Sequence, residues 1–123
     1  MKPLAVRSLT MFAAIALVSL VLGPAAGARV ERASTTTISV KAGDFFFRLS
    51  AKSIARPGKV TFVVKNVGHL SHDFMINHKR TALIKPRKTA TLTVRFATKG
   101  RFPYRCTVKG HAAGGLRGVF TVR

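Results

Sequence analysis

Residues 104–118 read YRCTVKGHAAGGLRG, and this stretch determines how the rest of the chain is interpreted. Cys106 is the only cysteine of the sequence and stands five residues before His111. Glycines at positions 110, 114, 115 and 118 give the segment the backbone freedom to turn tightly, so both side chains can be directed toward one point. A soft thiolate and an imidazole in one short loop suit copper or zinc.

The N-terminus indicates that this thiol is exported. Lys2 and Arg7 precede an apolar stretch at 9–22, and small residues follow up to Ala28. These are the features of a signal peptide, residues 1–28, with cleavage expected after Ala28. An uncleaved anchor is the alternative, although a membrane span needs about 20 apolar residues. A single thiol in an oxidising periplasm, cell envelope or extracellular space cannot form an internal disulfide, which favours a metal ligand.

Residues 29–123 suffice for one small domain. We expect a polar, flexible arm at 29–35 and a domain at 36–123, in which short apolar runs alternate with turn signals. No stretch has a sustained helical period. The pattern predicts an all-β fold, a small antiparallel β-sandwich of about seven or eight strands. The expected strands lie at 36–40, 45–49, 59–65, 72–77, 89–96, 101–106 and 117–123.

The chain is strongly basic, with 22 Lys and Arg against 3 Asp and Glu and a formal net charge of +19. The acidic residues are Glu31, Asp44 and Asp73. The basic residues are spread over the whole domain, whereas nucleic-acid binders usually concentrate charge and interleave aromatics. We therefore expect a solvated cationic surface with no specific nucleic-acid partner. Such a surface attracts anionic proteins, envelopes or membranes and repels copies of itself, which predicts a monomer.

Three further histidines could supply a second imidazole. His72 shares an expected strand face with Phe74 and Ile76, so its side chain can project inward, and it is the best placed. His69 lies in a turn, and His78 precedes two basic residues, so solvated side chains are expected for both. A hydrogen-bonded histidine without a metal is the alternative interpretation of His72.

Two separated motifs resemble those of the cupredoxins, the small blue-copper electron-transfer domains similar to plastocyanin. Residues 106–111, CTVKGH, followed by GLRG at 115–118, resemble their C-terminal copper loop. Residues 66–74, NVGHLSHDF, resemble the segment that carries their first histidine ligand, and the likeness extends from 41 to 122. It implies a Greek-key sandwich with one type 1 copper ion held by His72, Cys106 and His111. It also implies an electron carrier between redox partners rather than an enzyme.

The sequence departs from the family where an axial methionine is usual, because that position is Leu116. Leucine has no donor atom, so the resemblance implies a nearly three-coordinate copper with a raised reduction potential. Met75 lies three residues after His72 and is expected to point to the opposite face. Met1 and Met11 belong to the predicted signal peptide.

His111 is the expected exit for electrons, with Ala112, Ala113 and Leu116 as an apolar docking patch for an acidic partner. Copper delivery in the cell envelope would use the same ligands and stays an alternative. A non-redox protein that binds polyanions on a degenerate cupredoxin frame is another. A cysteine hydrolase is disfavoured because the short loop leaves little room at the thiol. Structural zinc normally has four protein ligands, and only three are evident.

Overall fold

The protein is described here by a computed structural model, which describes residues 34–123 together with residues 2, 3, 5, 14, 16–19 and 23. The predictions of a signal peptide at 1–28 and an arm at 29–35 fall mostly outside these residues. No helix among the described residues is long and apolar enough to cross a membrane. The fold below belongs to the unit formed by residues 31–123.

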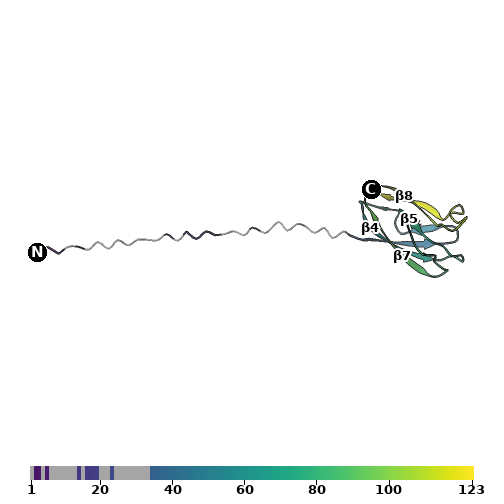
Figure 1. The fold of residues 1–123 in the computed structure, drawn as a ribbon, viewed down its shortest axis with the longest axis horizontal. Helices are drawn as coiled ribbons and strands as arrows, with labels where there is room; N and C mark the ends of the chain where they lie inside the picture. Colours follow the sequence, from purple (N-terminus) through teal and green to yellow (C-terminus); the bar gives the residue numbers. More distant parts are fainter. Residues whose placement is uncertain (1, 4, 6–13, 15, 20–22, 24–33) are drawn as a thin grey trace. The chain divides into compact units, whose positions relative to one another are not determined.

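The described residues form nine strands and no helix, arranged in two sheets (Figure 1). The first sheet has the order β2-β1-β4-β7 and consists of β1 (Thr36–Ala42), β2 (Phe47–Leu49), β4 (Gly58–Asn66) and β7 (Thr89–Phe96). The second has the order β3-β9-β8-β5-β6 and consists of β3 (Ser53–Ile54), β5 (Met75–Ile76), β6 (Lys79–Arg80), β8 (Gly100–Arg105) and β9 (Arg117–Val122). The predicted all-β sandwich is confirmed.

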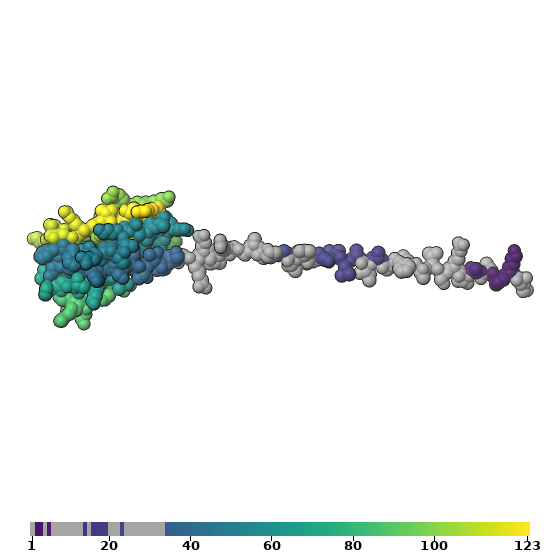
Figure 2. Space-filling model, turned by 180° about the vertical axis from the view of Figure 1, so that it is seen from behind, coloured from purple at the N-terminus to yellow at the C-terminus, as the bar shows by residue number. Residues whose placement is uncertain are grey.

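Both sheets are mixed, because β1 pairs with β4 and β3 pairs with β9 in parallel. The other strand pairs are antiparallel, as the alternating pattern predicts. Figure 2 shows the C-terminal residues in yellow along one edge of the domain, beside teal residues from the middle of the chain. Since parallel strands end at the same edge, the turn after β1 lies next to the turn after β4.

One apolar core lies between the sheets. Alternate residues of β1 and β4 are buried, so one face of each strand points inward. Phe62 lies at the centre of an aromatic cluster, with ring centroids 5.2 Å from Phe74 and 5.5 Å from Phe120. Aromatic pairs at these separations stabilise a core beyond the area they bury. This packing fixes the two sheets against each other and gives the strand ends defined positions.

The strand bounds differ from the sequence prediction mainly around β5. The predicted strand at 72–77 is reduced to Met75–Ile76, and His72 forms an isolated bridge with Ile84. Asn77 and His78 have positive φ values of 48° and 61°, which suit the tight hairpin turn between β5 and β6. β3 and β6 have only two residues each and gave no pattern to detect.

Candidate metal centre

The strand pairing brings two separate segments to one end of the sandwich. Met75 of β5 lies opposite Arg105 of β8, so the residues before β5 and after β8 meet. Arg105 also lies opposite Arg117 of β9, so the ligand loop, defined here as residues 106–116, closes over the same end. His72 precedes β5, while Cys106 and His111 belong to the ligand loop. The topology therefore predicts that these three side chains converge.

The donor atoms of His72, Cys106 and His111 all lie within 4.8 Å of one another. The two Nδ1 atoms are 3.0 Å apart, and Cys106 Sγ is 3.7 Å from His111 Nδ1. Ligand bonds of about 2.0–2.3 Å in a trigonal arrangement would place the donors about 3.5–3.8 Å apart. The Cys106–His111 separation falls in this range and the Nδ1–Nδ1 separation is shorter, so small shifts of the imidazole rings would let this donor set hold a soft metal such as copper.

His72 is fully buried and is fixed on both its backbone and its ring. Its N–H donates to the Ile84 carbonyl at 3.0 Å and its carbonyl accepts the Ile84 N–H at 2.7 Å. Its Nε2 lies 3.0 Å from Asp44 Oδ1. A carboxylate accepts but does not donate, so Nε2 carries the proton and the Nδ1 lone pair faces the cluster.

Asn66 holds the turn that leads to His72. Its side chain is fully buried and donates to the carbonyls of Leu70 at 2.7 Å and Ile84 at 2.8 Å. Its Oδ1 accepts the Gly68 N–H at 2.9 Å. A buried polar side chain without hydrogen-bond partners would destabilise the fold, and these bonds satisfy the amide of Asn66. Asn66, the first residue of the motif at 66–74, therefore braces this segment.

Asp73 joins the segment of His72 to the ligand loop. Its N–H donates to Cys106 Sγ at 3.5 Å, and its carboxylate accepts the N–H of Thr107 at 2.6 Å and also the Thr107 hydroxyl. The residue is buried, with 5% exposure. The residue that follows His72 is therefore hydrogen bonded to the Cys106 thiol and to Thr107, and these bonds do not depend on a metal.

The protonation of the site follows from these contacts. Burial raises the pKa of the Cys106 thiol, while the N–H groups of Asp73 and Val108 act in the opposite direction. Binding of a metal to the thiolate would therefore release a proton. The pKa of Asp44 lies well below its usual range, first because the N–H groups of Leu70 and His69 donate to the carboxylate. The His72 and His69 rings add to this effect.

The ligand loop is held by its own backbone. Cys106 N–H donates to the Leu116 carbonyl at 2.9 Å, and Leu116 N–H donates to the His111 carbonyl at 3.1 Å. Gly115 has a φ of 127°, and a Cβ there would collide with the Phe45 carbonyl. His111 itself is partly exposed, whereas Cys106 is buried.

Leu116 is fully buried, which corrects one expectation from the sequence. A docking patch of Ala112, Ala113 and Leu116 was expected, but a buried side chain cannot belong to it. The reason is the pair of backbone hydrogen bonds that tie Leu116 to Cys106 and His111 and turn its side chain inward. Ala113 is exposed and Ala112 is partly exposed.

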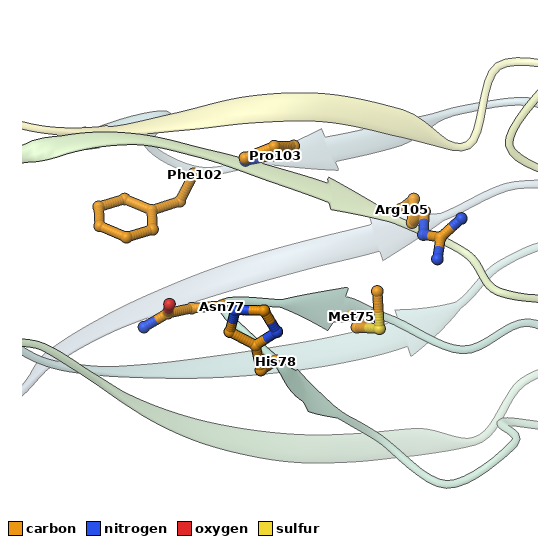
Figure 3. A pocket seen from close by; sticks show the side chains of 6 residues that line it. All are labelled: Met75, Asn77, His78, Phe102, Pro103 and Arg105. Carbon is orange, nitrogen blue, oxygen red and sulfur yellow. The ribbon is translucent and has the colours of Figure 1, made fainter.

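The other candidates from the sequence lie outside the cluster. The His69 side chain is 97% exposed and contacts Asp44, and His78 is exposed. Met75 points into a pocket of about 380 Å³ on the outer face of the second sheet, which it lines with Asn77, His78, Phe102, Pro103 and Arg105 (Figure 3). Met75 is the only methionine among the described residues, and it lies on the face opposite to His72, as its spacing predicts.

Sequence reasoning missed the roles of Asp44 and Asp73 in this site. The sequence singled out Asp44 and Asp73 only as two of the three acidic residues of a basic chain. One signal was present. Acidic residues are rare in this basic chain, and two of the three, Asp44 and Asp73, precede or belong to the motif at 66–74. What the sequence could not supply is the parallel pairing of β1 and β4, which carries Asp44 to His72.

No protein-family model matches the sequence, and no curated protein matches it significantly. Solved structures do match. The reduced auracyanin from the photosynthetic bacterium Roseiflexus castenholzii is 20% identical with a TM-score of 0.63, over 72% of this chain and 97% of that chain. Auracyanin A, a "blue" copper protein from Chloroflexus aurantiacus, is 17% identical with a TM-score of 0.61, over 73% and 100%. The copper nitrite reductase from Nitrosomonas europaea is 20% identical with a TM-score of 0.59, over 72% and 41%.

Proposed function

The fold of this chain is that of the cupredoxins, and from this premise we propose that it is an exported small blue copper protein that carries single electrons between redox partners. The observation that carries the proposal is the convergence of the donor atoms of His72, Cys106 and His111 within 4.8 Å. The description of auracyanin A as a blue copper protein supports it. The apolar stretch behind a basic N-terminus supports export to the periplasm, cell envelope or exterior.

Bound copper would supply a one-electron couple, and the residues around it would serve that couple by staying in place. His72 and Cys106 are buried, and their backbones are hydrogen bonded to Ile84 and Leu116, so they keep water out and hold their donor atoms at fixed separations. His111 is partly exposed and offers a short path to the surface. Buried and braced ligands favour retention of a metal over its delivery to another protein.

Leu116 would stand at the axial position of this centre. Its side chain is buried and its backbone is hydrogen bonded to both ligands of the loop. Leucine offers no lone pair, and the Met75 thioether lies on the outer face of the second sheet. A weak axial donor stabilises the oxidised ion more than the reduced one, so its loss raises the reduction potential. We therefore propose a type 1 site depleted in axial ligation.

The surface around His111 suits an acidic protein partner. Phe45 is 71% exposed and lies against Gly115 of the ligand loop, and Leu70 is 49% exposed and is hydrogen bonded through its N–H to Asp44, the residue before Phe45. Lys109 within that loop and Arg117 directly after it are both exposed. An apolar patch within a cationic surface would steer an anionic partner, and association should slow as salt rises. The strong net charge also supports a monomer.

The proposed activity is electron transfer rather than catalysis. The likeness to the nitrite reductase is confined to 41% of that enzyme's chain, and it does not carry an enzymatic activity to this protein. The two auracyanins described above, in contrast, match over 97% and 100% of their length.

Titration of the purified protein with Cu(II) tests the proposal. We expect an intense thiolate-to-copper absorption near the red end of the visible spectrum and a higher melting temperature, because the metal binds the folded state. Cys106→Ser is the matched control, since it keeps the size of the side chain and removes the thiolate. A colourless protein whose thiol reacts freely after addition of copper would contradict the proposal.

A further inference from the structure

The two acidic residues in the described part of this very basic chain both lie at the candidate metal centre. Asp44 belongs to the turn after β1, and Asp73 directly follows His72. Their contacts differ. Asp73 accepts from Thr107 and so holds the ligand loop, whereas Asp44 contacts the ring of a proposed ligand directly. A contribution to the surface charge does not explain why Asp44 lies against the ring of His72.

The Asp44 carboxylate is surrounded by donors. Oδ1 accepts the N–H of His69 at 2.9 Å, the N–H of Leu70 at 3.0 Å and the Nε2–H of His72 at 3.0 Å. The His69 ring lies 3.3 Å from Oδ2. The side chain is only 19% exposed. These contacts orient one oxygen of the carboxylate toward the back of the His72 ring.

The surrounding turns leave room for this carboxylate. Ala42 of β1 lies opposite Asn66 of β4 in the parallel register, so Asp44 faces the segment 68–72. Gly68 lies against Asp44, and a Cβ at this position would collide with the carboxylate. Asn66 fixes the same turn from the other side through the Gly68 N–H. Two turns from distant parts of the sequence are thus shaped around one acidic side chain.

We propose that Asp44 is a positioning residue of the copper centre, which fixes His72 in the tautomer that presents Nδ1 to the metal and places a negative charge behind that ligand. The second part rests on the proposed function. A hydrogen-bonded carboxylate makes an imidazole a stronger donor, and such partners commonly contribute 10–100-fold to metal affinity. The charge favours Cu(II) over Cu(I), so Asp44 lowers the potential and opposes the effect proposed for Leu116.

The substitutions Asp44→Asn and Asp44→Ala separate geometry from charge. Asparagine keeps an oxygen acceptor for all three bonds to Oδ1 but loses the charge. Alanine loses both. His69→Ala is the matched control, because it removes an exposed partner of the same carboxylate without touching His72.

Two measurements on these variants test the proposal. The first is the ¹⁵N chemical shifts of His72 in the metal-free protein, at a pH where the imidazole is neutral. The second is the reduction potential of the copper-loaded protein. We expect an unchanged tautomer with a raised potential in Asp44→Asn. In Asp44→Ala the tautomer should no longer be fixed and Cu(II) binding should weaken by roughly 10–100-fold. Each tenfold loss for Cu(II) relative to Cu(I) raises the potential by about 59 mV.

The outcomes distinguish this proposal from the proposed function. A wild-type protein that binds no copper refutes the copper function, and the metal-free NMR experiment then still decides whether Asp44 fixes the tautomer. If His72 in Asp44→Ala keeps its Nε2–H form, the positioning role is wrong. If the potential of Asp44→Asn equals that of wild type and of His69→Ala, the charge effect is wrong. Should Asp44→Ala fail to fold, Asp44→Leu tests the positioning role instead. Loss of the Nε2–H form of His72 in that variant supports the role, and its persistence contradicts it.

Discussion

His72 and His111 place the same kind of atom in the same cluster, but the protein holds them in different ways. His72 is fully buried, and its backbone and ring are bonded to Ile84 and Asp44, residues far away in the sequence. His111 is partly exposed, and its backbone bonds are to Val108, Gly114 and Leu116 of its own loop. One ligand belongs to the core of the sandwich, and the other belongs to a loop that closes over it.

Because its two imidazoles are held differently, this small site can be both rigid and accessible. Long-range bonds to His72 make its position depend on the whole fold, so it should move little when the metal changes its charge. Local bonds leave His111 at the surface, where an electron can leave and a partner can dock.

Removal of each imidazole should have unequal consequences. We expect His72→Gly to lose the blue absorption, and added imidazole should not restore it, because the vacated position is sealed in the core. His111→Gly should also lose it, but imidazole in solution should restore it, because that position is open to solvent. Visible spectra of the copper-loaded variants with and without imidazole make the measurement. Equal rescue of both variants would show that the two sides do not differ in access.

Asn66→Ala should destabilise the segment that holds His72 without altering a proposed ligand. It removes three hydrogen bonds, one of them to the buried Ile84 carbonyl and one to the carbonyl of Leu70, at a cost of about 2–4 kcal/mol. Urea unfolding of the metal-free protein measures this loss. Thr93→Val is the control. It breaks an exposed hydrogen bond between Thr93 of β7 and Thr61, which lies on the same strand β4 as Asn66, and should cost under about 0.5 kcal/mol. Equal costs for both would mean that Asn66 is not a brace.

Much of this architecture could be predicted from the sequence, because local patterns carry it. The alternation in 89–96 gave β7 with its observed bounds, and the burial of Phe62, Val60 and Val64 follows from the pattern of β4. The parallel pairing of β1 with β4 could not be predicted. Register between distant strands depends on the packing of both sheets and leaves no local signal.

The candidate site shows the same division. Cys106 and His111 are five residues apart, and their spacing indicated a shared loop. His72 was placed by its strand face and by the resemblance to cupredoxins, and the structure brings it to the same point. Its partner Asp44 lies 28 residues away and was missed, since only the fold makes the two neighbours. The burial of Leu116 was missed for a related reason. Backbone hydrogen bonds of the folded loop turn its side chain inward, and no local sequence pattern indicates them.

The ligand loop can be tested at Gly115. Gly115→Ala should destabilise the protein by about 2–3 kcal/mol, because it combines a positive φ with a collision against the Phe45 carbonyl. Gly110→Ala is the matched control in the same loop, with a φ of 83° and no atom within 4 Å of the new Cβ, and should cost about 1 kcal/mol. Urea unfolding of both metal-free variants makes the comparison. A larger loss at Gly110 would show that strain, not the contact with Phe45, limits this loop.

The smallest expected change is the most informative about redox tuning. Leu116→Met replaces one buried side chain of the ligand loop by another of similar volume, so stability should change by less than about 1.5 kcal/mol. If Leu116 occupies the axial position, the thioether should stabilise Cu(II) and lower the potential. Leu116→Ile is the control, since it changes shape without adding a donor. The tuning of this centre would then come from both sides, with Leu116 raising the potential from the ligand loop and Asp44 lowering it through His72. A potential that rises in Leu116→Met, or that falls equally in Leu116→Ile, would place the axial direction elsewhere.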